Sequence, residues 1–284
     1  MASANGPSAR AAGELTLGDM TVRRMGFGAM RITGEGIWGE PPDREAALAV
    51  LRRAVELDVN LIDTADAYGP EVSENLIAEA LHPYPEDLVI ATKGGLTRDG
   101  PGSWHRDCSP QHLREACEAS LRRLRLDRID LYQLHAVDPK VPYEESIGAL
   151  AELREEGKVR HVGVCNVGLD ELRLARSIVP VVSVQNRYSM TARDSENVLE
   201  ACERDGLGFL PWFPLDAGSA PSGKVEEVAR RHGITPMQVA LAWLLARSPV
   251  MIPIPGTSKV EHLEQNVAAA AARLGDDEVA TLAV

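Results

Sequence analysis

The sequence predicts an α/β fold, a (β/α)8 TIM barrel with a short N-terminal β-hairpin. Apolar runs of strand length recur eight times along the chain, and stretches with the spacing of an amphipathic helix separate them. This is the pattern of parallel βαβ units with right-handed crossovers. A doubly wound open sheet and a closed barrel both fit it. The units are evenly spaced and no linker or break in composition divides them, which favours the barrel.

The expected elements follow one another in a regular order. The hairpin occupies residues 14–22, where apolar and polar residues alternate on both sides of Gly18-Asp19. Strands are expected at Met25–Gly28, Asn60–Asp63, Leu88–Thr92, Ile129–Leu134, Val159–Val164, Val181–Gln185, Phe209–Trp212 and Met251–Ile254. Helices are expected at Arg44–Leu57, Ser73–Leu81, Pro110–Leu124, Tyr143–Glu156, Leu169–Ser177, Ser195–Arg204, Lys224–Arg247 (broken near Gly233) and Val260–Ala272. In the first of these helices Leu48, Leu51 and Val55 share one face.

The length and the first residues of the chain bound its organisation. Single barrels commonly reach the 284 residues found here. The first dozen residues are small and polar, without the apolar core of a signal peptide. We therefore expect a flexible leader over residues 1–13 and one barrel domain over residues 14–284. No apolar stretch has the length of a membrane span, so we expect no membrane partner. We also expect a cytoplasmic protein that is a monomer or a weak homo-oligomer.

Charge and cysteine content exclude several classes of function. The formal net charge of −12 argues against a nucleic-acid partner. The four cysteines, Cys108, Cys117, Cys165 and Cys202, form no Cys-x-x-Cys pair. Their spacing argues against a zinc knuckle or a disulfide framework and fits a reducing compartment. Paired histidines at strand ends, typical of metal-dependent barrel hydrolases, are absent, so no metal is expected.

One motif matches a nucleotide-binding pattern in the wrong context. Gly34-Glu-Gly36-Ile-Trp-Gly39 has the spacing of the glycine fingerprint of dinucleotide-binding folds. The third glycine of that fingerprint lies inside the helix that it opens, but here Pro41 and Pro42 follow at once. We interpret the motif as a flexible loop on the barrel rim.

Four polar side chains are expected at the catalytic rim. Asp63 and Tyr68 follow an apolar strand, Lys93 ends the next one, and His135 follows a third. A structural alternative is that Asp63 only ends its strand while Asp66 or Ser73 caps the following helix. A lysine that ends an apolar strand is uncommon in a purely structural role. Because the C-terminal ends of barrel strands converge on one mouth, we expect an acid/base site there.

The chemistry of these four groups suits proton donation to a developing alkoxide. A phenol with a pKa near about 10 is a weak acid at neutral pH. We expect the Lys93 ammonium to lower the pKa of Tyr68, and the Asp63 carboxylate to hold the ammonium in place. Neutral His135 could orient a carbonyl oxygen. No side chain supplies electrons, so a cofactor must deliver the hydride.

Six segments, in chain order, match the pattern of one family. They are residues 63–69, 91–93, 130–135, 157–166, 184–186 and 254–259, and the match extends from about Arg24 to about Ala272. On these segments the sequence resembles the aldo-keto reductases. The resemblance implies NADPH-dependent reduction of an aldehyde or ketone, with Tyr68 as general acid, Lys93 and Asp63 as the pair that tunes its pKa, and His135 as the group that orients the carbonyl.

The resemblance also implies a cofactor site for NADPH/NADP+. Asn166 and Gln185 would bind the nicotinamide carboxamide, Trp212 would stack on its ring, and Cys165 would form a wall of the pocket. The segment after the last strand, with Gly256, Thr257, Ser258, Lys259 and His262, would grip the 2′-phosphate, and Gln265 and Asn266 would hold adenine. Many relatives carry arginine at the position of His262, which is only partly charged near neutral pH, so the preference for NADPH is less firmly implied.

The substrate is expected to be a small carbonyl compound. Trp38 and Trp104 lie in glycine-rich rim loops, and Phe213 follows Trp212, so we expect these three aromatic side chains, with Tyr68 and His135, to face the substrate. Two functions remain open. One is a working reductase of pyridoxal, sugar-derived or natural-product carbonyls. The other is a cofactor-binding protein that senses redox state with little turnover.

Overall fold

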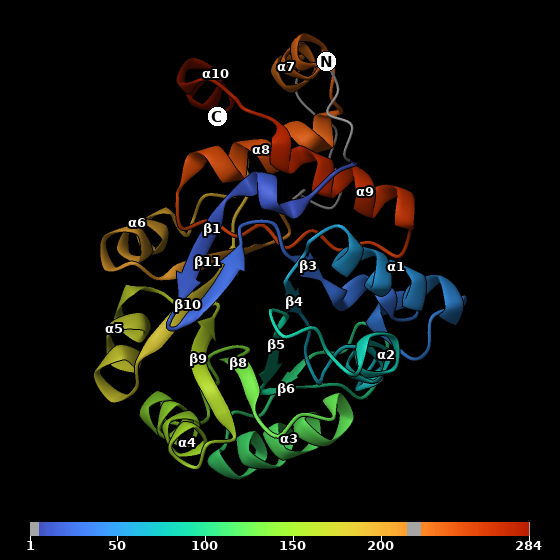
Figure 1. Cartoon of the computed structure of the whole chain (residues 1–284). Helices are drawn as coiled ribbons and strands as arrows, with labels where there is room; N and C mark the ends of the chain where they lie inside the picture. The colour runs from blue at the N-terminus through green and yellow to red at the C-terminus, as the bar shows by residue number, and fades with distance from the viewer. Residues whose placement is uncertain (1–5, 215–222, 284) are drawn as a thin grey trace.

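A curled sheet of seven parallel strands forms most of a barrel (Figure 1). The computed structural model describes residues 6–214 and 223–283. The strand order is β11-β10-β9-β8-β5-β4-β3. The strands are β3 Phe27–Gly28, β4 Leu61–Asp63, β5 Val89–Gly94, β8 Ile129–Leu134, β9 Val159–Cys165, β10 Val181–Arg187 and β11 Gly208–Trp212. They confirm the predicted parallel core, with ends that shift by one or two residues.

The segment predicted as the last strand, Met251–Ile254, closes the barrel without forming a regular strand. On one side, the Ile252 amide donates to the Phe209 carbonyl at 2.8 Å. On the other, the Gly26 amide donates to the Pro253 carbonyl at 2.9 Å. Two prolines in and beside this segment lack amide hydrogens, which prevents a continuous hydrogen-bond ladder. The eighth position of the barrel is therefore filled, but a regular strand there was a wrong prediction.

The helices lie outside the sheet and surround it (Figure 1). They are α1 Arg44–Glu56, α2 Val72–Leu81, α3 Pro110–Leu124, α4 Tyr143–Glu155, α5 Leu169–Ile178, α6 Glu196–Asp205, α7 Gly223–His232, α8 Pro236–Arg247, α9 Val260–Ala268 and α10 Asp276–Leu282. Helix starts follow local chemistry. The Ser109 and Thr235 hydroxyls cap α3 and α8, and in both a proline takes the first helical position. Gly233 adopts a φ of +65° between α7 and α8, where the break was predicted.

The predicted hairpin covers the amino-terminal end of the barrel. Strands β1 (Glu14–Leu17) and β2 (Met20–Arg23) pair in antiparallel fashion. Figure 1 shows them lying across the ring of strands. Leu17 packs so closely on Gly208, the first residue of β11, that a Cβ at that glycine would lie 2.4 Å from the leucine side chain. The hairpin therefore closes the amino-terminal end of the barrel, and the carboxyl ends of the strands form its open end.

The segment expected as a leader packs partly on the barrel. Residues 1–5 lie outside the described residues. Ala9–Ala12 form a 3-10 turn in which Ala9 is buried. The Ala9 amide donates to the Leu57 carbonyl at 2.9 Å, and the Ser8 hydroxyl donates to Asp58 at 2.6 Å. The chain thus contacts the barrel before the predicted boundary at residues 13 and 14.

Two small features had no counterpart in the sequence analysis. Strands β6 (Leu96–Thr97) and β7 (His105–Arg106) form a short hairpin in the loop that follows β5. Helix α10 packs near the end of the chain against α7 and α8. Strands of two residues span only a single period of the strand pattern, too short for an alternation to be recognised, so periodicity could not predict them.

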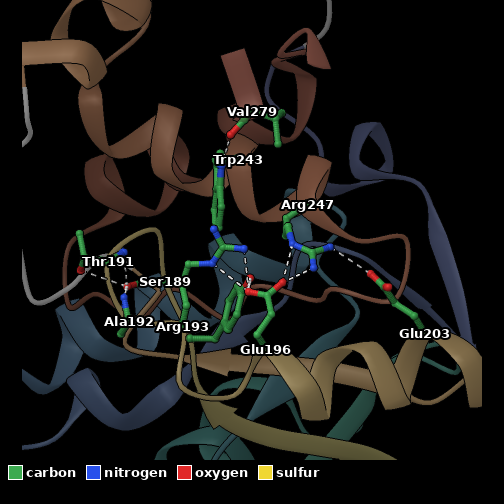
Figure 2. A network of polar contacts seen from close by, with 10 residues as sticks. Ser189, Thr191, Ala192, Arg193, Glu196, Glu203, Trp243, Arg247 and Val279 are labelled. Atoms are coloured by element: carbon green, nitrogen blue, oxygen red, sulfur yellow. Dashed lines mark hydrogen bonds and ion pairs between the residues drawn. The ribbon is translucent and has the colours of Figure 1, made fainter. Parts of the chain in front are cut away.

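A polar network joins α6 to α8 on the outside of the barrel (Figure 2). The Glu196 carboxylate accepts hydrogen bonds from Tyr188 at 2.7 Å, from Arg193 at 2.7 Å and from Arg247. The Arg193 guanidinium also lies 5.7 Å from the centre of the Trp243 ring. One carboxylate therefore pairs with two arginines, one of which also contacts Glu203, and binds a buried tyrosine.

Among the described helices, none is both long enough and apolar enough to cross a membrane.

Replacing Glu196 should weaken the whole barrel. In Glu196→Gln the two arginines lose their shared countercharge in a half-buried site. We expect the free energy of unfolding to fall by about 1–3 kcal/mol. Equilibrium unfolding in urea measures this change. The matched control is Glu203→Gln, which removes a single 3.3 Å contact with Arg247 and should cost less than about 1 kcal/mol. Equal losses in the two variants would contradict the assignment.

Candidate active site

The predicted polar residues gather at the carboxyl ends of the strands. Asp63 is the last residue of β4, Lys93 lies at the end of β5, and His135 directly follows β8. The loop after β4 brings in Tyr68, whose amide donates to the Ala65 carbonyl at 3.2 Å in a tight turn. Residues separated by more than 70 positions in the chain therefore meet at one mouth, as the barrel geometry requires.

The Lys93 ammonium is the centre of this cluster. Its Nζ donates to Asp63 Oδ2 at 2.7 Å, to the Thr64 carbonyl at 2.8 Å and to the Tyr68 hydroxyl at 3.3 Å. The lysine is 0% exposed. The Tyr68 and His135 rings meet edge to face with their centroids 5.8 Å apart. The four groups are thus in contact, and the phenol oxygen is held by the ammonium.

Asp63 is fixed on its other side by two amides. Its Oδ1 accepts from Gln185 at 2.7 Å and from Gln133 at 3.2 Å. Gln185 was expected to bind a nicotinamide; its NH2 group is used here on the carboxylate. Gln133 was not predicted, because a polar residue in the middle of an apolar strand gives no periodic pattern. All Asp63 oxygens are therefore engaged, which holds the carboxylate in one orientation.

Electrostatics set the protonation of the cluster. Burial lowers the pKa of Lys93, but the attraction and hydrogen bond of Asp63, together with Tyr68 and Cys165, outweigh burial and raise this pKa above its ordinary value. Burial raises the pKa of Tyr68 to about 12, although Lys93 opposes the change. The expected net lowering was wrong, because Asp63 offsets the ammonium and the phenol is out of water. At neutral pH the site holds a charged lysine and a neutral phenol.

His135 is a neutral ring at the mouth. Burial, with a smaller effect of the Lys93 ammonium, lowers the pKa of His135 well below its usual range. Its Nδ1 is buried and has no hydrogen-bond partner within the described residues. A neutral imidazole beside a neutral phenol can donate to an oxygen without repelling the neighbouring ammonium.

A cleft of about 890 Å³ opens above these groups. Of the predicted residues, it is lined by Asp63, Tyr68, Trp104, His135, Asn166, Gln185, Trp212, Phe213, Gly256, Thr257, His262, Gln265 and Asn266. Sequence analysis missed further lining residues, among them Met30, Arg31, Ile37, Leu96, Thr235, Met237 and Gln238. These missed residues lie in short 3-10 turns after β3, in the two-residue strand β6 and at the start of α8, where pattern and motif give little information.

Two predicted wall residues do not line the cleft. Cys165 is 1% exposed, and burial raises the pKa of its thiol, so it packs behind the surface. Trp38 contacts the Arg98 guanidinium, whose centre is 5.7 Å from the indole ring. The sequence gives the segment in which each of these residues lies, but not the neighbours that it contacts.

Of the structural alternative for the loop after β4, Asp63 does end its strand, but the expected helix cap is wrong. The residue before α2 is Glu71, which makes no side-chain cap. The Ser73 hydroxyl instead contacts Thr64 at 2.7 Å and donates to the Ala29 carbonyl at 3.2 Å. Neither Asp66 nor Ser73 caps the helix.

One end of the cleft presents the start of α9. Ser258 and Lys259 are exposed there, next to the lining residues Gly256 and Thr257. The Thr257 hydroxyl accepts from the Lys259 amide at 3.1 Å. A Cβ at Gly256 would lie 2.5 Å from the Gly28 carbonyl, so only glycine allows the two backbones to approach. Helix starts with free amides favour anionic groups.

The other end carries an aromatic face fixed by an amide. The Trp212 indole donates to Asn166 Oδ1 at 2.9 Å, and the Asn166 NH2 group donates to the His135 carbonyl at 2.9 Å. Asn166 has a φ of +57°, a backbone conformation that asparagine tolerates. The amide of this residue therefore links the indole to the strand that carries His135.

In the part of the chain that the structure describes, no three His, Cys, Asp or Glu side chains are grouped to hold a metal ion.

Comparisons with known proteins point to one family. A model described as the aldo/keto reductase family matches residues 24–283. An uncharacterized oxidoreductase of Schizosaccharomyces pombe is 50% identical over 99% of this chain and 92% of its own length. Pyridoxine 4-dehydrogenase of Escherichia coli is 44% identical, over 94% of this chain and 96% of its own. A Klebsiella pneumoniae aldo-keto reductase, solved in complex with NADPH, superposes with a TM-score of 0.80 at 27% identity, covering 95% of this chain and 93% of that one.

The raised pKa of Tyr68 can be measured directly. Burial disfavours the phenolate, so at about pH 10.5 Tyr68 should remain protonated, whereas an ordinary tyrosine with a pKa of about 10 would be mostly ionised. The difference in tyrosinate absorbance between the wild type and Tyr68→Phe isolates this residue. A difference signal with its midpoint below about pH 10 would show that Lys93 outweighs burial.

Proposed function

Because the chain belongs to the aldo/keto reductase family, whose members are oxidoreductases of carbonyl compounds, we propose that it reduces an aldehyde or ketone to an alcohol with NADPH. In this proposal the barrel is one catalytic domain and Tyr68 is its general acid. The observation that carries the proposal is the contact of the Tyr68 hydroxyl with the buried Lys93 ammonium at 3.3 Å, at the floor of the cleft.

The residues of the cleft fit a nicotinamide dinucleotide. The start of α9 offers backbone amides and the exposed Lys259 to phosphate groups. The close approach of Gly28 to Gly256 leaves the backbone bare where a nucleotide would pass. Trp212 offers a flat apolar face for the nicotinamide. Asn166 and Gln185 line the cleft as well, and their amides, which here bind His135, Trp212 and Asp63, would exchange these partners for the carboxamide. NADPH supplies the hydride that no side chain of the chain can supply.

The roles of the four central residues follow from their geometry. Tyr68 donates its proton to the carbonyl oxygen as negative charge develops there. Lys93, held by Asp63, stabilises the phenolate that remains, since its Nζ already contacts the phenol oxygen. Neutral His135 donates a hydrogen bond to the same carbonyl oxygen and fixes its direction. The reverse reaction, alcohol oxidation, requires the phenolate and should accelerate as the pH rises toward the Tyr68 pKa of about 12.

The proposed substrate is an aromatic aldehyde of the pyridoxal type. One curated relative is named for the oxidation of pyridoxine, and it matches nearly the full length of this chain. The substrate part of the cleft is lined by Leu96, Trp104 and Phe213, apolar side chains that suit a flat ring. Pyridoxal combines such a ring with an aldehyde.

Removing the phenol oxygen should abolish most of the activity. Tyr68→Phe keeps the ring and the apolar packing but lacks the proton, so the rate of pyridoxal reduction should fall at least about a hundredfold. NADPH binding, measured by the quenching of tryptophan fluorescence, should be retained. If the variant keeps its turnover, Tyr68 is not the acid. If the wild type binds NADPH but reduces no carbonyl compound, the redox-sensing function is favoured instead.

Cofactor preference should depend on Lys259. This residue is exposed at the start of α9, and its charge would attract the 2′-phosphate that only NADPH carries. Lys259→Ala should raise the apparent KM for NADPH by about tenfold and that for NADH by much less. Glu261→Ala, in the same exposed turn, is the control. Equal effects of Lys259→Ala on both cofactors would place the 2′-phosphate elsewhere.

A further inference from the structure

All three guanidinium nitrogens of Arg98 donate hydrogen bonds to backbone carbonyls at the rim of the cleft. It lies just after β6 and is partly buried. Its Nε donates to Ser103 at 2.6 Å, its Nη1 to Ile37 at 3.0 Å and Ala67 at 3.4 Å, and its Nη2 to Gly36 at 3.0 Å and Gly100 at 3.4 Å. A guanidinium has five N–H groups, so each has a carbonyl partner here.

These carbonyls come from three separate rim loops. One loop follows β3 and contains the glycine motif of residues 34–39, one follows β4 and carries Tyr68, and the third is the β6–β7 hairpin itself. The first and third loops touch, since a Cβ at Gly36 would lie 3.3 Å from Pro101 Cβ. Ala67, one of the acceptors, directly precedes the proposed acid. Arg98 therefore ties the substrate side of the cleft into one unit.

The same guanidinium holds an aromatic ring at the mouth. The Arg98 Cζ lies 3.8 Å from the centre of the Trp104 ring, a distance typical of a stacked cation–π contact. Trp104 is 39% exposed and lines the cleft. An exposed indole in a glycine-rich loop would otherwise sample several rotamers. The contact with Arg98 fixes its plane and leaves the rest of the ring to the cleft.

We propose that Arg98 is a positioning residue that determines substrate class: by fixing Trp104, it builds a flat apolar wall that selects planar aromatic carbonyl compounds over saturated ones. The inference rests on the proposed carbonyl reduction. Because all five N–H groups of Arg98 are engaged, the residue has no donor left for an anionic substituent of the substrate. The guanidinium thus binds groups of the protein and does not bind the substrate.

The test compares two aldehydes of similar size, benzaldehyde and cyclohexanecarboxaldehyde, which differ in planarity. In Arg98→Met the KM for benzaldehyde should rise by about tenfold, as expected for the loss of an ordered stacking face, while the KM for cyclohexanecarboxaldehyde changes by less than about twofold. The dissociation constant of NADPH should stay unchanged, because the Arg98 contacts named above are all with the rim loops and none is with α9. Arg106→Met, an exposed arginine of the same hairpin, is the matched control and should leave both KM values unchanged.

A second variant separates positioning from folding. Trp104→Leu removes the exposed ring itself and should reproduce the selective rise, and the double variant Arg98→Met/Trp104→Leu should add little to either single change, since both act through one wall. Arg98→Lys keeps the charge but not the planar fork, and should resemble Arg98→Met. Equal changes for both aldehydes, or additive effects in the double variant, would overturn the proposal.

A binding measurement keeps this inference distinct from the proposed function. Calorimetry on the NADP+ complex compares benzyl alcohol with cyclohexylmethanol, and it requires no turnover. If the wild type reduces neither aldehyde, the proposed function fails, and the ratio of the two dissociation constants decides the inference alone. A wild-type preference for benzyl alcohol that Arg98→Met abolishes supports the wall, and a ratio that the variant leaves unchanged refutes it.

Discussion

The buried ion pair of Lys93 and Asp63 is the interaction on which the site depends. A charged lysine inside a barrel is costly unless every donor has a partner. Here the three donors of the ammonium meet a carboxylate, a backbone carbonyl and the phenol, and the carboxylate is held in turn by Gln133 and Gln185. Four strands of the barrel contribute to this arrangement. The fold therefore supplies the rigid polar shell, and the phenol lines the cleft beside it.

The sequence predicted this centre well because barrel topology converts strand ends into neighbours. Lys93 and His135 could be placed without any knowledge of contacts, since a polar residue at the end of an apolar barrel strand lies at the mouth of the barrel. The surrounding shell could not be assigned in the same way. Gln133 lies within a strand and Arg31 in a short 3-10 turn. Arg98 binds backbone carbonyls, which every residue type carries. The wrong prediction for the Tyr68 pKa has a similar origin, because the sequence names the neighbouring charges but not the loss of water.

Different charge environments divide the cleft into two ends. At the floor, the ammonium and the carboxylate neutralise each other, the imidazole is neutral and the phenol is protonated. Toward α9, Lys259 is exposed beside free helix-start amides. An elongated molecule with an anionic end and an uncharged ring would lie in one direction only.

The incomplete eighth strand has a consequence for the mechanical behaviour of the molecule. Few backbone hydrogen bonds join β3 to the segment Met251–Ile254, because prolines interrupt the pairing. The barrel is therefore weakly closed beside Gly28 and Gly256. Any nucleotide that contacts both glycines would connect the first strand of the barrel to the last segment across this weakly paired position. A bound nucleotide would then oppose separation of these two segments, so the stability of the folded barrel would depend on the concentration of the cofactor.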